Sequence, residues 1–183
     1  MSRLLSCCLA LGGLLGLTAV VLAADLPEVG KPAPAIDLPA SSIGTVLPDK
    51  KSADKLRLED LRGKNVVLFF YPKALTKGCT IESCGFRDKV KQFAALDTVI
   101  VGISTDPLSL QEKFTEKENL NFPLFADADK SVTKAYGALN ERGVANRYTY
   151  IIDKKGVLRK IYTKVNPAKH PQEVYDFIKE NLK

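Results

Sequence analysis

The sequence predicts one α/β domain with a mixed central sheet flanked by helices. Two uninterrupted apolar runs, residues 65–71 and 98–104, have the composition of strands that are buried on both faces. Two later strand-like runs, residues 148–152 and 157–162, are separated by a short turn, which is typical of an antiparallel hairpin. The chain has 183 residues, and a single core becomes comfortable at roughly 100 to 200 residues.

The composition is that of an ordinary globular protein. Hydrophobic residues make up 45% of the chain and charged residues 26%, so a packed core is expected. The formal charge of +6 is mild, and the lysines and arginines are scattered among acids apart from short runs at residues 50–51 and 154–155. This pattern argues against a nucleic-acid-binding surface.

The first 24 residues have the features of a secretory signal peptide. Arg3 precedes an apolar run from Leu9 to Leu22, and the small residues Ala23 and Ala24 follow it. The alternative is an uncleaved anchor helix, but the run is shorter than the roughly 20 apolar residues that span a bilayer comfortably. We therefore expect an exported protein, periplasmic or secreted. Its mature domain would cover residues 25–183 and would have no stable membrane association after cleavage.

An N-terminal hairpin extension is expected before the main sheet. Short apolar alternations at residues 35–38 and 56–58 predict two strands. The chain from Asp25 to Lys64 is rich in proline, serine and lysine, which predicts a loop insertion in this hairpin.

The remaining segments alternate between strand and helix signals. The first buried strand ends at Pro72, and apolar residues at helical spacing predict an amphipathic helix over residues 80–96. Further helices are predicted at residues 109–118, 130–136 and 171–182. Parallel crossovers followed by one antiparallel edge hairpin give a thioredoxin-like architecture.

Two cysteines remain after removal of the signal peptide, and both lie near the start of the helix that follows the first buried strand. Ligands in open α/β sheets bind beyond the carboxyl ends of strands, at the N-termini of the next helices. Cys79 falls at that place. The helix macrodipole and free N–H groups there favour a thiolate. Cys79 is therefore the candidate reactive cysteine.

Cys79 and Cys84 could instead form a structural disulfide, which is common in exported proteins. Five residues along an intact helix place two Cα atoms about 9 Å apart, whereas a disulfide needs about 4.4 to 6.8 Å. A permanent bond would therefore forbid the predicted helix, while a transient bond requires only that the helix fray during turnover. The geometry favours the transient bond and leaves the permanent one open.

No metal site is predicted. Structural zinc typically has four ligands, and the mature chain offers two cysteines and His170. His170 stands next to Pro171 at the start of the last predicted helix, and we expect a surface or capping residue rather than a general base.

The segment around Cys79 carries a motif. Pro72-x-x-x-Thr76-x-x-Cys79, with Cys84 five residues later, resembles the active-site motif of the peroxiredoxins, and in particular the peroxiredoxin Q or bacterioferritin comigratory protein group. The similarity covers roughly Gly30 to the end of the chain. It includes, in order and spacing, residues 102–106, 122–127, 136–137, 147–153 and 169–170.

The resemblance implies a role for each residue of the motif. Cys79 is implied to be the peroxidatic cysteine, whose sulfenic acid condenses with the resolving Cys84 to give the redox disulfide Cys79–Cys84. Thr76 would contact the thiolate and the peroxide through its hydroxyl. Pro72 would shield the site from solvent.

The resemblance also implies a charged partner for the sulfur. Arg147 matches the family arginine, whose guanidinium would favour the thiolate and hold the peroxide. Glu82, one turn along the helix from Cys79, would orient Arg147. The implied function is a monomeric thiol peroxidase that reduces hydrogen peroxide and organic hydroperoxides. It needs no cofactor, because sulfur is the redox centre.

Two features depart from the group. The loop Ser41 to Lys55 is longer than the common pattern, and an export signal is not the rule there. Thioredoxin is the usual reductant in the family, so an exported enzyme would need a thioredoxin-like protein outside the cytoplasm. The alternative function is thiol-disulfide exchange on protein substrates, but its usual signature is Cys-x-x-Cys, which this spacing does not match.

Overall fold

The computed structural model describes residues 25–50 and 52–182. The predicted signal peptide, residues 1–24, lies outside the described residues. In the described part of the chain, no helix is long and apolar enough to cross a membrane.

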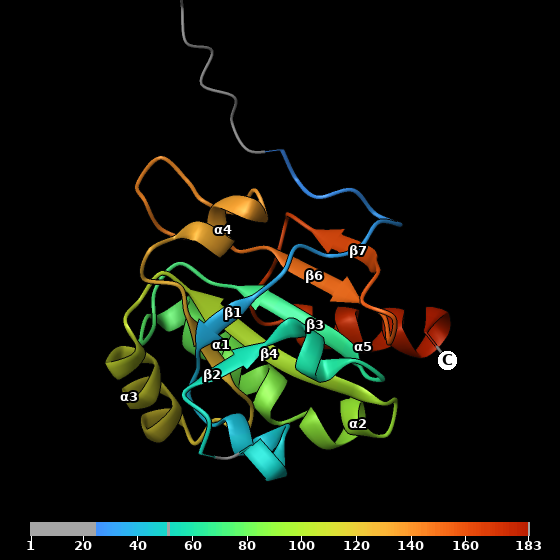
Figure 1. Ribbon diagram of the computed structural model, residues 1–183, viewed down its shortest axis with the longest axis horizontal. Helices are drawn as coiled ribbons and strands as arrows, with labels where there is room; N and C mark the ends of the chain where they lie inside the picture. The colour runs from blue at the N-terminus through green and yellow to red at the C-terminus, as the bar shows by residue number, and fades with distance from the viewer. Residues whose placement is uncertain (1–24, 51, 183) are drawn as a thin grey trace, which may run out of the picture.

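The centre of the molecule is a five-stranded mixed sheet with the strand order β5-β4-β3-β6-β7 (Figure 1). Strands β3, β4 and β5 are mutually parallel, whereas β6 runs antiparallel to β3 and β7 antiparallel to β6. The strands are β3 (Asn65–Phe70), β4 (Thr98–Ser104), β5 (Leu124–Ala126), β6 (Thr149–Ile152) and β7 (Leu158–Tyr162). The predicted parallel crossover and antiparallel edge hairpin are confirmed.

The N-terminal hairpin is also confirmed. Strands β1 (Asp37–Pro39) and β2 (Lys55–Arg57) pair antiparallel, with Leu38 opposite Leu56. The connection between them contains two single-turn 3-10 helices, η1 (Ile43–Thr45) and η2 (Pro48–Lys50), and a third, η3 (Leu58–Leu61), follows β2.

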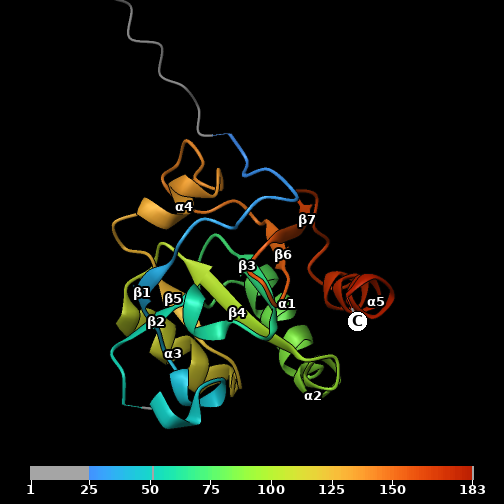
Figure 2. The ribbon, with the colours of Figure 1, turned by 45° about the vertical axis from the view of Figure 1, so that its right-hand side comes forward.

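Within residues 25–50 and 52–182, five α-helices accompany the sheet. They are α1 (Lys77–Arg87), α2 (Val90–Ala94), α3 (Leu108–Glu118), α4 (Ser131–Ala135) and α5 (His170–Asn181). In the two ribbon views, α4 and the N-terminal segment lie at one end of the molecule, away from α2 and α3 (Figures 1 and 2).

The central strand is buried on both faces because its side chains alternate between two cores. Val66, Leu68 and Phe70 belong to a cluster that includes the N-terminal hairpin and α4. Val67 and Phe69 face the other way, into a cluster built with α1, α2, α3 and α5. This two-residue period explains why the sequence of β3 has no polar face.

The largest departure from the predicted boundaries is in the helix that follows β3. The helix expected over residues 80–96 begins earlier, at Lys77, and is interrupted between α1 and α2, where Lys89 has a non-helical backbone (φ −106°, ψ 0°). The break redirects the chain so that Phe86 and Phe93 both reach the core, with ring centroids 6.1 Å apart.

Strand β5 was not predicted as a strand. It has three residues, all buried, and a run of that length shows no periodicity. It is held by parallel pairing to the end of β4, where Gly102 lies opposite Leu124.

Candidate active site

Cys79 lies where the sequence places it, in the first turn of α1 beyond the carboxyl end of β3. The loop of residues 71–76 connects the two elements, and Thr76 is the extended residue at which α1 starts. The Cys79 side chain is only 1% exposed. Cys79 and Cys84 both belong to α1, and both are free thiols. The structure therefore represents the reduced form, with both cysteines on one continuous helix.

The strand register brings Arg147 to Cys79. Phe69 of β3 pairs with Thr149 of β6, and the Phe70 amide donates to the Tyr148 carbonyl at 2.7 Å. The segment just before β6 therefore lies at the carboxyl end of β3, and Arg147 is two residues before Thr149. There Arg147 Nη2 donates to Cys79 Sγ at 3.2 Å. A guanidinium at this distance stabilises negative charge on the sulfur and leaves its other donors available.

Glu82 holds this arginine from the next turn of the helix, as the resemblance implied. Arg147 Nη1 donates to Glu82 Oε2. Glu82 is fully buried, and burial raises its pKa to about 7, although the charge of Arg147 acts in the opposite direction. The second oxygen, Oε1, is buried without a hydrogen-bond partner among the described residues. Among the described residues, Arg147 is therefore the side chain to which the Glu82 carboxylate is hydrogen-bonded.

Gly78 leaves space for the Arg147 guanidinium next to α1. A Cβ atom at this position would lie 3.3 Å from Arg147 Nη2 and 3.8 Å from Pro167 Cγ. The first contact is tighter than an ordinary van der Waals distance, so a side chain would displace Arg147. The lack of a side chain at Gly78 therefore serves the placement of Arg147 rather than the formation of the helix.

The other two motif residues lie in the loop before the helix. Thr76 is exposed, and its hydroxyl donates to the Lys73 carbonyl at 2.9 Å. That bond leaves the lone pairs of the hydroxyl available to a ligand. Pro72 is partly buried next to Tyr71. The contacts of Thr76 with thiolate and peroxide, and the shielding by Pro72, stay predictions.

Cys84 lies five residues, or about one and a half turns, further along α1 in a different environment. It is partly exposed, and its thiol donates to Glu118 Oε2 at 3.8 Å. Burial raises the pKa of Cys84, and the neighbouring Glu118 carboxylate acts in the same direction, whereas Arg87 lowers it. The two cysteines therefore differ in kind: Cys79 has a cationic partner, and Cys84 an anionic one.

Two positions of α1 differ from the amphipathic pattern expected for this helix. Ile81 is an apolar residue whose side chain is 41% exposed. At Gly85, an added Cβ would lie 2.8 Å from Pro171 Cγ. The glycine thus allows α5 to pack directly against α1.

The prediction that His170 is a surface or capping residue is wrong, because its side chain is fully buried. Its ring stacks edge-on against Phe86 and Tyr162, and Nε2 is 2.8 Å from the Thr149 hydroxyl. Burial lowers the pKa of His170. Phe86 of α1 and Tyr162 of β7 thus pack against the ring at the start of α5, next to the close approach of Pro171 to Gly85.

Asp106 is a residue near the site that sequence reasoning missed. Its carboxylate accepts a hydrogen bond from the Ala74 amide, inside the loop before Cys79, at 2.8 Å. A signal was present, because Asp106 follows β4, and the ends of adjacent parallel strands meet at one edge of a sheet.

The described residues contain no group of three or more His, Cys, Asp or Glu side chains placed to hold a metal ion. The chemistry visible in the site is that of a sulfur atom beside an arginine.

Comparisons with known proteins identify the family of this chain. Residues 29–161 match the AhpC/TSA family. The chain is 37% identical over 155 residues to the putative peroxiredoxin bcp of Coxiella burnetii, which covers 80% of this chain and 95% of the relative. It is also 37% identical over 160 residues to peroxiredoxin Bcp of Bacillus subtilis, covering 84% and 96%.

Solved structures show the same fold. The peroxidoxin BcpB of Mycobacterium tuberculosis superposes with a TM-score of 0.74 at 30% identity, covering 85% of this chain and 99% of that one. A PrxQ mutant of Xylella fastidiosa gives a TM-score of 0.75 at 23% identity, covering 85% and 98%. The thioredoxin-like fold expected from the sequence is confirmed.

Proposed function

Because the chain belongs to the AhpC/TSA family and is a thiol-dependent peroxidase of the peroxiredoxin type, we propose that Cys79 is its nucleophile and Cys84 its resolving thiol. The observation that carries the assignment is the contact of 3.2 Å between Arg147 Nη2 and Cys79 Sγ. A buried carboxylate, Glu82, holds that guanidinium from behind.

In the first step, the Cys79 thiolate attacks one oxygen of the peroxide. The O–O bond breaks, the second oxygen leaves as water or an alcohol after taking up a proton, and Cys79 becomes a sulfenic acid. Arg147 can donate to an oxygen that develops negative charge, and its fixed plane orients those donors in advance. Hydrogen peroxide and organic hydroperoxides are the proposed substrates.

In the second step, the Cys84 sulfur attacks the Cys79 sulfenic acid. An S–S bond forms, the S–O bond breaks, and the hydroxyl leaves as water. The helix must open for this step, because an intact helix keeps the two Cα atoms about 9 Å apart. A dithiol then reduces the disulfide by exchange.

The proposed reductant is thioredoxin or a thioredoxin-like protein. We also propose that the protein is exported and that residues 1–24 are then removed. The mature protein would be a monomer, and its reductant would have to be present in the same extracytoplasmic compartment. N-terminal sequencing of protein from its native host tests export. A start near Ala24 or Asp25 supports the proposal, and a start at Met1 or Ser2 would overturn it.

The function is tested by peroxide consumption by the purified protein with thioredoxin, thioredoxin reductase and NADPH. We expect turnover with hydrogen peroxide and with an organic hydroperoxide, and none with Cys79→Ser. A protein that reduces protein disulfides but consumes no peroxide would instead be a thiol-disulfide exchange protein.

A further inference from the structure

The loop that leads into α1 holds an unfavourable backbone conformation. Leu75, directly before Thr76, has φ +62°, in the left-handed region that non-glycine residues rarely adopt. Such a residue costs of the order of 1 kcal/mol or more, and it persists where the surroundings impose it. The structure must therefore contain a contact that holds this loop.

The contact is made by Asp106, from the segment after β4. Its Oδ2 atom accepts hydrogen bonds from the Ala74 amide at 2.8 Å and from the Ser104 hydroxyl at 2.9 Å. Ala74 immediately precedes the strained Leu75 and is itself buried. The carboxylate thus fixes the loop one residue before the strain and two residues before Thr76.

Buried side chains extend this contact back to the start of the loop. The Tyr71 hydroxyl donates to Gln111 Oε1, and Gln111 Nε2 donates to Ser104 Oγ at 2.8 Å. Ser104 in turn donates to Asp106. Tyr71, Gln111 and Ser104 are fully buried. The chain of hydrogen bonds therefore joins both ends of the Tyr71–Ala74 segment.

The side-chain donors of this network point toward the Asp106 carboxylate, whereas the Asp106 backbone amide donates back to Ser104 Oγ at 3.2 Å. Tyr71, Gln111 and Ser104 each donate toward the next member, and the Ala74 amide donates from the other side, so the network ends on one acceptor. A carboxylate suits that place, because it accepts from several donors and strengthens each bond through its charge. Without an acceptor there, the Ala74 amide would be buried unpaired.

We propose that Asp106 is a positioning residue for peroxide reduction, a role that rests on the proposed function of Cys79. Asp106 acts through the Ala74 amide: it holds Leu75 in its strained conformation and so sets where the Thr76 hydroxyl stands relative to Cys79 and Arg147. The reaction with peroxide requires both Thr76 and Arg147 to be correctly positioned. An alkylating reagent that reacts with the Cys79 sulfur alone does not require Thr76.

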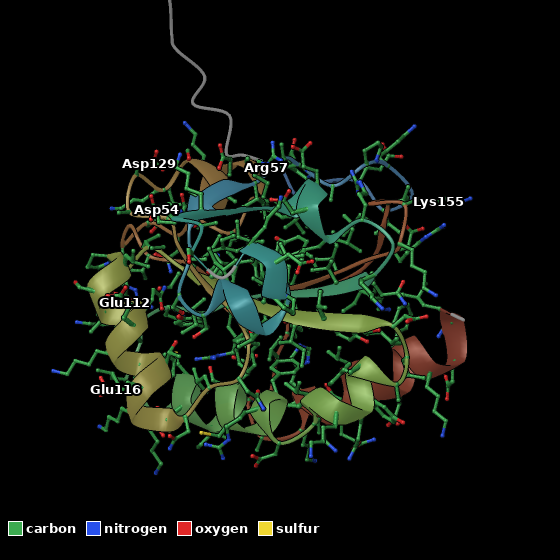
Figure 3. The ribbon with its side chains drawn as sticks, turned by 60° about the horizontal axis from the view of Figure 1, so that its bottom comes forward. Asp54, Arg57, Glu112, Glu116, Asp129 and Lys155 are labelled. Carbon is green, nitrogen blue, oxygen red and sulfur yellow. The ribbon has the colours of Figure 1, made fainter. Side chains whose placement is uncertain are left out.

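The test compares Asp106→Ala with Asp106→Asn, which keeps an oxygen acceptor for the Ala74 amide. Asp54→Ala, in the exposed loop before β2 (Figure 3), is the matched control. We expect Asp106→Ala to lower kcat/KM for hydrogen peroxide by about 10- to 100-fold, since a misplacement of about 1 Å can cost that much. The kcat/KM of Asp106→Asn should stay within about threefold of the wild-type value. The kcat/KM of Asp54→Ala should equal the wild-type value.

A second readout separates positioning from general damage. Alkylation of Cys79 by iodoacetamide, measured in a Cys84→Ser background, should change less than about twofold in Asp106→Ala. Peroxide kinetics unchanged in Asp106→Ala, or lost equally in Asp106→Asn, would overturn the proposal. So would an alkylation rate that falls as far as the peroxide rate.

Hydrogen exchange in the wild-type protein tests the contact without any variant. The Ala74 amide should be protected although it lies in a loop, and rapid exchange at Ala74 would contradict the proposal. A wild-type protein that reduces no peroxide would refute the proposed function instead, and protection at Ala74 would be unaffected by that result.

Discussion

Arg147 Nη2 donates a hydrogen bond of 3.2 Å to Cys79 Sγ, although the two residues are 68 positions apart in the chain. The antiparallel pairing of β6 with β3 accounts for this approach, since it places the segment before Thr149, which contains Arg147, at the carboxyl end of β3. The buried Glu82 carboxylate fixes the guanidinium from the other side. The pairing of β6 with β3 therefore places Arg147 beside the Cys79 sulfur, and Glu82 of α1 orients its guanidinium.

Replacing Arg147 should impair the peroxide step far more than the fold. We expect Arg147→Ala to lower the second-order rate with hydrogen peroxide by about 100-fold or more, because the loss is one of electrostatic stabilisation. Arg147→Lys should recover little of it, because lysine lacks the planar fork of donors. Stopped-flow kinetics measure the rate, with the exposed Arg142→Ala as control. A rate within about twofold of wild type in Arg147→Ala would exclude the role.

Substitution of the two glycines of α1 should separate chemistry from packing. Gly78→Ala would crowd the Arg147 guanidinium, so we expect the peroxide rate to fall by a few-fold to about tenfold with no loss of thermal stability. Gly85→Ala would meet Pro171, and overpacking of about 1–3 kcal/mol should outweigh the gain of about 1 kcal/mol in helix propensity. Urea unfolding and peroxide kinetics on both variants check this, and the reverse assignment of effects would contradict it.

The sequence predicted the strands correctly where a hydrophobic run extended over several residues. Strands β3 and β4 show continuous apolar runs, and the hairpin of β6 and β7 has a recognisable turn, so their pairing followed from connection rules. The motif placed Cys79 at a helix N-terminus, and the structure puts Arg147 and Glu82 beside it. These features depend on local pattern or on motif position.

The remainder depends on tertiary contacts that no local pattern carries. His170 is buried where α5 packs onto α1, a contact made at Gly85 and Pro171, which are 86 residues apart in the chain. The hydrogen bond from Ala74 to Asp106 joins a backbone amide to a side chain 32 residues away. The α1–α2 break at Lys89 interrupts a sequence whose apolar spacing continues through it.

Stability should depend on pH through His170, the one histidine of the chain. Burial lowers its pKa in the folded protein, whereas the unfolded chain takes up a proton at about pH 6.5. The unfolded state therefore binds more protons below about pH 6.5, and this contribution to stability falls as the pH falls, by at most about 1.4 kcal/mol per pH unit.

Glu82 acts in the opposite direction. Its folded pKa of about 7 lies above its ordinary value of 4.5, so its contribution rises as the pH falls through 7. Comparison with His170→Gln isolates the histidine. The free energy of unfolding of the wild type, minus that of the variant, should decrease between pH 7 and pH 5. A difference that is constant over this range would contradict the burial of a neutral imidazole.

Oxidation should loosen α1 locally. The two cysteines share one continuous helix, and a bond between them requires Cα atoms about 4.4 to 6.8 Å apart. Amides from Thr80 to Arg87 should therefore exchange faster in the oxidised protein, while the strands of the central sheet keep their protection. Peptide-resolved hydrogen exchange in both redox states measures this. Equal protection of the segment in both states, with the Cys79–Cys84 bond mapped, would contradict the requirement for unwinding.

The most direct test is to stop the cycle after its first step. Cys84→Ser should react once with an equivalent of hydrogen peroxide and remain as a sulfenic acid, since the resolving thiol is absent. Trapping with dimedone followed by peptide mass spectrometry should place the adduct on Cys79, with one adduct per chain. An adduct on any other residue, or no adduct while peroxide is still consumed, would contradict the assignment of Cys79 as the nucleophile.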